Sequence, residues 1–396
     1  MSKATTPPGF GFGEDEEMLR DLARKFLDEK LPVEALRKLV AEAPEPVYDH
    51  GQRPPWAPGL WKQIVELGWA GLAVEEADGG AGISMAGIAG LVEEVGRHAL
   101  PSPLISTLSA ALVLRSAASA PGREQLRRIA LGTTAALAIT PASGSWEPGD
   151  CGITGTRQGD GYLLNGSAHF VQDAFKADFF VGTARVDDEL LLFALPSEAE
   201  GVSLEQDHIH DLTRDQGTLR LSDVRLSAKD VVSPNGEEVL QRAWPGLLVL
   251  VSADLCGTSE WQLQTTVEYA KNRKQFDHPL GFFQAVKHPL VNAMVEIDRA
   301  RSLLYHAACC IDMGSPESLE AACMAKSAAS DAGAFISDRS VQLHGGIGFT
   351  WECDVHIYFK RSMHNQALLG DGVHQRRKLA DRLIGPIGAT VENETA

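Results

Sequence analysis

The residue types best suited to bind an anion occur in two short segments of the C-terminal half of the chain. Arg273 and Gln275 lie in the first segment, with Gln284 shortly after them. Gly345 and Gly346 form the centre of the second. A guanidinium can give two parallel hydrogen bonds to phosphate oxygens, and a glycine pair lets backbone N–H groups approach an anion closely. Either segment alone would more often be a surface residue or a turn, but together they favour a site for a phosphorylated ligand.

The composition restricts the classes of partner. The 396 residues carry a formal net charge of −17, which argues against nucleic acid or an anionic membrane as the main partner. The N-terminus lacks the regions of a signal peptide, and no stretch of about 18 uncharged apolar residues predicts a membrane span. The six cysteines include the adjacent Cys309 and Cys310 and show no zinc-ligand spacing. We therefore expect a cytoplasmic protein with reduced thiols and no metal site.

The pattern of apolar residues predicts an α+β chain of three regions that must position these segments. Apolar residues recur every three or four positions in residues 1–137, which indicates an N-terminal helical domain. Short apolar runs separated by Gly, Asp and Asn predict a strand-rich domain over 138–235, best suited to a small antiparallel barrel or sandwich. Helical spacing returns in 236–396, and Val286 to Ile311 predict one helix of about 25 residues. This third region is expected to be a helical bundle.

Several motifs, distributed over these three regions, resemble those of the acyl-CoA dehydrogenase family. The matching segments span nearly the whole chain in family order and are Glu75–Gly82, Glu93–Arg97, Leu164–Gly166, Tyr269–Phe276, Pro279–His288 and Gln342–Thr350. The resemblance implies an N-terminal helical domain, a middle β-barrel or sandwich domain and a C-terminal four-helix bundle. It also implies an FAD-dependent oxidoreductase that dehydrogenates an acyl-CoA thioester, such as a fatty-acyl or steroid side chain, and passes electrons to an electron-transfer flavoprotein.

In this family the arginine and glycine segments of one subunit embrace the adenosine half of an FAD that is held mainly by its neighbour. The residues that the resemblance assigns to this half-site are Arg273, Gln275, Phe276, Gln284, Gln342, Gly345 and Gly346. The half that faces the flavin ring departs from the family. Thr140 opens a shortened Thr-Pro segment without the usual Glu, and Phe170-Val171-Gln172 replaces the usual Trp-Ile-Thr. Phe170 can still stack on the ring and Gln172 can still donate, although either could equally be an ordinary strand residue.

The catalytic base of the family is missing from both of its usual positions. Removing the α-proton of a thioester needs a carboxylate while the β-hydrogen leaves as hydride to the flavin. The resemblance places that carboxylate at Gly370 or, in a minority of relatives, at Leu247. Asp371 is one residue out of register and is the remaining candidate, although Asp beside glycines is often a turn residue. Asp254 lies two helical turns after Leu247, where we expect a charge on the helix surface.

This chain preserves the nucleotide half of the FAD site but has lost features of the ring half. In this respect it resembles the non-catalytic subunit of the two-gene, heterotetrameric acyl-CoA dehydrogenases of bacterial steroid side-chain degradation. We therefore expect a heterotetramer with a homologous subunit, two copies of each, and two FAD molecules. The first alternative is a homotetrameric dehydrogenase with Asp371 as base. A second is a non-enzymatic subunit that binds CoA esters or acts as a scaffold. Flavin monooxygenases and oxidases of the same fold remain further options.

Overall fold

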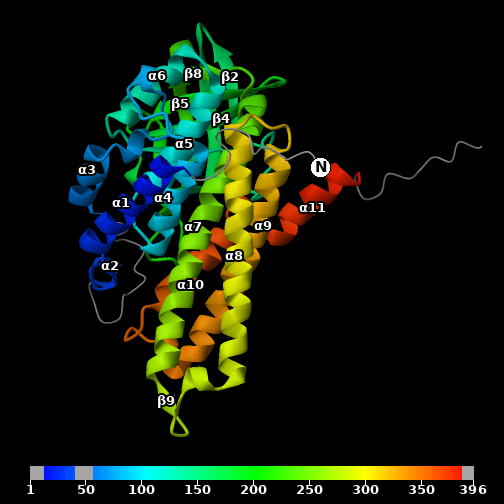
Figure 1. Ribbon diagram of the computed structural model, residues 1–396. Helices are drawn as coiled ribbons and strands as arrows, with labels where there is room; N and C mark the ends of the chain where they lie inside the picture. The colour runs from blue at the N-terminus through cyan, green and yellow to red at the C-terminus, as the bar shows by residue number, and fades with distance from the viewer. Residues whose placement is uncertain (1–12, 41–56, 386–396) are drawn as a thin grey trace, which may run out of the picture.

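The computed structural model describes residues 13–40 and 57–385, which form three parts in chain order (Figure 1). The first part is helical. Its helices are α1 (Glu14–Lys30), α2 (Val33–Val40), α3 (Pro58–Glu66), α4 (Met85–Arg97), α5 (Leu104–Ala117) and α6 (Ala120–Ala130). Ser84 caps α4, because its hydroxyl accepts a hydrogen bond from the Gly87 N–H. The carboxylate of Asp312 accepts two more N–H groups of this helix start and thereby joins α4 to the C-terminal part.

The middle part is one mixed sheet of eight strands. Its strands are β1 (Ala135–Ala138), β2 (Ile153–Gln158), β3 (Gly161–Gln172), β4 (Phe179–Val186), β5 (Glu189–Pro196), β6 (Val202–Gln206), β7 (Gln216–Leu226) and β8 (Val231–Ser233). Their order is β6-β7-β3-β2-β4-β5-β8, with β1 paired to β4. The expected antiparallel arrangement is wrong for β4, which pairs in parallel with both β1 and β2, whereas the other strand pairs of this sheet are antiparallel. The hairpin of β2 and β3 separates β1 from β4 in the chain, so these partners are not consecutive strands. The sheet also begins at Ala135, before the predicted boundary at residue 138.

The C-terminal part is the expected four-helix bundle, built from α7, α8, α9 and α10. Its elements are α7 (Gly236–Asn272), β9 (Lys274–Gln275), β10 (His278–Pro279), α8 (Gln284–Asp312), α9 (Ser318–His344), α10 (Val355–Ala367) and α11 (Gly372–Leu383). The helix predicted from Val286 to Ile311 is therefore confirmed as α8. The long helices extend from the sheet toward the β9–β10 hairpin, which connects the end of α7 to the start of α8 at the opposite end of the molecule (Figure 1).

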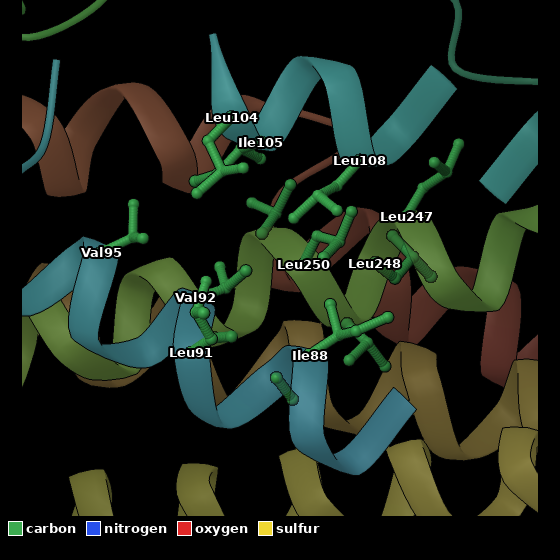
Figure 2. Close-up of a cluster of buried hydrophobic side chains, with 14 of the residues drawn as sticks. Ile88, Leu91, Val92, Val95, Leu104, Ile105, Leu108, Leu247, Leu248 and Leu250 are labelled. Atoms are coloured by element: carbon green, nitrogen blue, oxygen red, sulfur yellow. The ribbon is translucent and has the colours of Figure 1, made fainter. Parts of the chain in front are cut away.

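Helix α7 is the central element of the core. It packs against α4, α5, α8, α9 and α10. By length and composition α7 could cross a membrane, but 89% of its apolar window is buried inside the protein, as in a core helix. Figure 2 shows Leu247, Leu248 and Leu250 of α7 among the apolar side chains of α4 and α5. One of the two expected positions for a base is thus filled by a core leucine, Leu247, which is 1% exposed.

Candidate functional site

The two segments predicted to bind an anion lie together at the end of the bundle remote from the sheet. Arg273 is the C-terminal cap of α7, and Gly345 ends α9 with a φ of +66°, a conformation that favours glycine. Tyr269, one turn before Arg273, stacks on His344 with ring centroids 4.2 Å apart. The structure therefore brings the arginine segment and the glycine segment side by side within one chain.

Every residue assigned to this half-site is exposed to solvent. The side chains of Arg273, Gln275, Phe276, Gln284 and Gln342 are exposed. A Cβ atom built on the exposed Gly345 or Gly346 would meet nothing within 4 Å. An exposed guanidinium next to bare backbone suits an anionic, phosphate-bearing group.

The hairpin between β9 and β10 carries an unusual aromatic residue. Phe276 is 85% exposed and has a φ of +52°, which is uncommon for an aromatic side chain. Its ring meets Phe283 edge-on, with centroids 6.2 Å apart. An aromatic ring held outward in this way has most of its surface available for a ligand or a second chain.

The residues assigned to the flavin-ring half lie on the sheet, at the other end of the molecule. Thr140 is buried and bridges to His169, next to Phe170, which is 38% exposed. The Gln172 amide donates to the Gln216 side chain (2.7 Å) and to the Phe170 carbonyl (3.1 Å). Its oxygen is engaged as well, by a ring nitrogen of His364, which lies 2.8 Å away. The structure thus separates these residues from Arg273.

His364 was not identified from the sequence, although this residue contacts Gln172, which was predicted to face the flavin ring. It projects from α10, and burial lowers its pKa to about 4, so the ring is neutral near pH 7. A neutral ring donates through the nitrogen facing Gln172, which fixes the orientation of that amide. Since both amide hydrogens of Gln172 are then committed within the chain, the hydrogen bond that we expected it to donate to a flavin ring has no donor left.

The turn after α10 leaves no room for a base at its expected position. Gly370 has a φ of +90°, and a Cβ there would lie 2.3 Å from Cδ2 of His374. The buried Lys326 donates to the carbonyl oxygens of Gly370 (3.0 Å) and Gln366 (2.9 Å) and so holds this turn. Burial lowers the pKa of Lys326 to about 7. Position 370 can therefore carry only glycine in this backbone.

Asp371 acts as the N-terminal cap of α11. Its Oδ1 accepts the His374 N–H at 2.8 Å, and the residue is exposed to solvent. This is the structural role that aspartate beside glycine often has. A role for Asp371 as base stays a prediction, and the cap gives its carboxylate another function.

The expectation for Asp254 is wrong, because this residue is wholly buried. Arg361 donates to both of its oxygens, at 2.9 and 3.1 Å, and Arg214 and Asn365 also donate to it. Burial alone would raise the pKa of Asp254, but the two guanidinium groups outweigh it and hold the pKa below its usual value. Such a carboxylate is a poor base. The sequence pattern missed it because α7 is buried on nearly all sides, so no face of it could be assigned to solvent.

The N-terminal and C-terminal parts of the chain each match a known protein domain. Residues 13–136 match the model of the acyl-CoA dehydrogenase N-terminal domain, and residues 249–384 match that of the acyl-CoA dehydrogenase C-terminal domain. Acyl-CoA dehydrogenase IpdE2 of Mycobacterium tuberculosis is 31% identical over 370 residues, which cover 92% of this chain and 94% of that protein. The chain belongs to the acyl-CoA dehydrogenase family. Family membership confirms FAD as the cofactor and an oxidoreductase acting on acyl-CoA as the general activity.

Two solved structures are also similar to this chain. A variant of the Tcur3481-Tcur3483 steroid ACAD has a TM-score of 0.83 at 28% identity, covering 94% of this chain and 98% of that one. The ChsE4-ChsE5 complex from Mycobacterium tuberculosis gives a TM-score of 0.83 at 23% identity, covering 95% and 98%. The second likeness concerns the fold alone.

The residues present fit only part of an FAD molecule. Arg273 and the open glycine pair suit its pyrophosphate and adenosine half, because they are exposed and adjacent. The ring half is a poorer fit, since Gln172 is engaged within the chain and position 370 has no side chain. The ring half lies at the sheet, beside α10, and the nucleotide half lies near the β9–β10 hairpin at the far end of the bundle (Figure 1).

Proposed function

We propose that this chain is the acyl-CoA dehydrogenase subunit that supplies the nucleotide-binding half of an FAD site to a homologous subunit. In this arrangement the homologous subunit supplies the ring pocket and the base. The observation that carries the proposal is the separation of the two predicted half-sites in the fold: Arg273 and Gly345 lie at the hairpin end of the bundle, while Phe170 and Gln172 lie on the sheet. A single chain cannot close both halves around one cofactor, so a second chain must approach the hairpin end.

The condition of each carboxylate supports the non-catalytic role of this chain. Both expected base positions lack an acid, and position 370 has no space for a side chain. Asp254 is locked between two arginines in the core, and Asp371 caps a helix. None of these groups is both free and placed to take an α-proton. A homotetramer that uses Asp371 as base therefore receives no support from the geometry.

In the proposed assembly the cofactor would accept the substrate hydride, and this chain would hold its nucleotide half. The Arg273 guanidinium would neutralise pyrophosphate charge, with Gln275 and Gln342 as neutral donors. The bare backbone of Gly345 and Gly346 would donate N–H groups to the same region. These residues bind and orient; they move no proton.

The substrate class and location follow from similarity and are part of the proposal. IpdE2 is 31% identical, and the Tcur3481-Tcur3483 relative is a steroid ACAD, which supports an acyl-CoA derived from a steroid. An electron-transfer flavoprotein is the proposed electron acceptor. The cytoplasm is the proposed location, and all six cysteines are free, which accords with a reducing compartment.

Purification of the chain alone and together with a homologous acyl-CoA dehydrogenase subunit encoded beside it tests the proposal. We expect little FAD and no acyl-CoA turnover from the chain alone. The complex should contain one FAD for every two chains and should oxidise a steroid-derived acyl-CoA. Stoichiometric FAD with acyl-CoA turnover in a homo-oligomer of this chain would reject the proposal.

A further inference from the structure

A ladder of polar and aromatic contacts connects α7 to α9 along the lower half of the bundle. Its rungs are Gln262 Nε2 to Ser337 Oγ (3.1 Å), Thr266 Oγ1 to Ser340 Oγ (2.8 Å) and the ring stack of Tyr269 on His344 (4.2 Å). Residue numbers rise together along both helices, so α7 and α9 run in the same direction here. The last rung lies where both helices end, at Arg273 and Gly345.

Burial makes this ladder a determinant of register. The side chains of Gln262, Thr266, Ser337 and Ser340 lie in fully buried residues. If α9 slipped by a fraction of a turn against α7, these hydrogen bonds would break and the buried groups would gain no water in exchange, which is unfavourable. Apolar contacts between helices tolerate such a slip more easily, because they are not directional. The polar rungs therefore fix the axial position of one helix end relative to the other.

The Tyr269–His344 rung transmits this register to the predicted binding residues. The Arg273 N–H donates to the carbonyl of Tyr269 at 2.8 Å, and Gly345 directly follows His344. The Tyr269 hydroxyl also donates to the His344 carbonyl, at 3.4 Å. His344 is 5% exposed and lies with Nδ1 2.8 Å from the Ser340 carbonyl, which accepts its proton. Both rings are thus held from within the bundle, and neither belongs to the exposed ligand-facing set.

We propose that Tyr269 and His344 are positioning residues of the nucleotide grip, which consists of Arg273, Gly345 and Gly346. Their ring stack holds the Arg273 guanidinium and the Gly345-Gly346 backbone at the spacing that one dinucleotide needs. The inference rests on the proposed function, since it assumes that these segments bind FAD. Because a preorganised site loses less entropy on binding, loosening this rung should weaken FAD binding although neither ring touches the cofactor.

Titration of FAD into the cofactor-free complex with the partner subunit tests this inference. Tyr269→Leu, which removes the stack, should raise the dissociation constant of FAD by roughly tenfold, the scale of one aromatic pair. Tyr269→Phe keeps the ring and should stay within about threefold of the wild type. The comparison of the two variants assigns the effect to the ring of Tyr269 and not to its hydroxyl group.

Trp261→Leu is the matched control. Trp261 stacks on Tyr358 with centroids 3.6 Å apart, in the same bundle but away from the grip. It should lower the melting temperature as Tyr269→Leu does, yet leave FAD affinity within about threefold. The inference is overturned if Tyr269→Leu retains wild-type affinity, or if Trp261→Leu loses as much as Tyr269→Leu. Arg273→Ala, measured in parallel, decides the proposed function separately: if it too keeps wild-type affinity, the FAD site itself is wrongly placed.

Discussion

Asp254 and Arg361 form a fully buried, two-point salt bridge between α7 and α10, with Arg214 as a second cation on the same carboxylate. The sheet part contributes Arg214 and the bundle contributes the other two residues, so this bridge joins the two parts of the molecule. It also decides how an acidic residue near an expected base position is used. The carboxylate holds the fold together and is not available to a substrate.

Asp254→Asn should therefore destabilise the protein strongly. Removing one partner of a buried pair leaves uncompensated charge and costs about 3–5 kcal/mol. Thermal unfolding monitored by circular dichroism measures the loss. Asp338→Asn is the control, because Asp338 pairs with Arg339 on the surface, and such pairs contribute about 0–1 kcal/mol. An Asp254→Asn complex with wild-type stability but no turnover would show that Asp254 is a catalytic base instead.

Restoring a glutamate at position 370 should not create a dehydrogenase. Gly370→Glu would force a side chain into a φ of +90° and against His374, so we expect lower stability and no turnover by the chain alone. Gly314→Ala separates backbone strain from steric clash as the cause of the lost stability. Gly314 has a φ of +62°, but nothing lies within 4 Å of the Cβ that alanine would add. This substitution should cost only about 1–2 kcal/mol, the strain of a left-handed residue. Acyl-CoA oxidation by the purified Gly370→Glu chain would contradict this reading of the turn.

Asp371 variants distinguish a helix cap from a base. Asn can accept the His374 N–H as Asp does, so Asp371→Asn should leave both stability and the turnover of the complex nearly unchanged. Asp371→Ala should cost about 1 kcal/mol of stability through loss of the cap. Steady-state assays with an acyl-CoA and an artificial electron acceptor report the turnover. Loss of activity in a well-folded Asp371→Asn complex would show that Asp371 takes part in catalysis.

Asp215 should make the protein less stable as the pH rises. It is 1% exposed, and burial raises its pKa to about 7, with Asp173 nearby adding to this and Lys176 opposing it. The protonated form is thus favoured in the folded state, so its stabilisation is lost as the pH rises from near its ordinary value through about 7. Asp215→Asn should remove this loss and melt several degrees higher at pH 8. Asp223→Asn, an exposed change in β7, the strand that follows Asp215, should retain the wild-type pH profile.

The sequence predicted what depends on local pattern and missed what depends on burial. The apolar repeat of α8 and the exposed Arg273 could be found because helix periodicity and a motif are local signals. Lys326 and Arg361 could not, since a charged residue in a helix ordinarily indicates a solvent-facing position, and both are fully buried. The parallel pairing of β1 with β4 was missed for a related reason, because it joins strands that are far apart in the chain.

The dissociation constant of FAD from a complex in which only this chain carries Arg273→Ala tests the account most directly. Loss of a charge-assisted contact, worth about 1.5–3 kcal/mol, should weaken FAD binding roughly tenfold to a hundredfold, while Arg299→Ala, a surface change on α8, should leave it unaltered. Such a result would show that this polypeptide holds the nucleotide of a cofactor whose ring is bound by its partner. Wild-type affinity in the Arg273→Ala complex would contradict that arrangement.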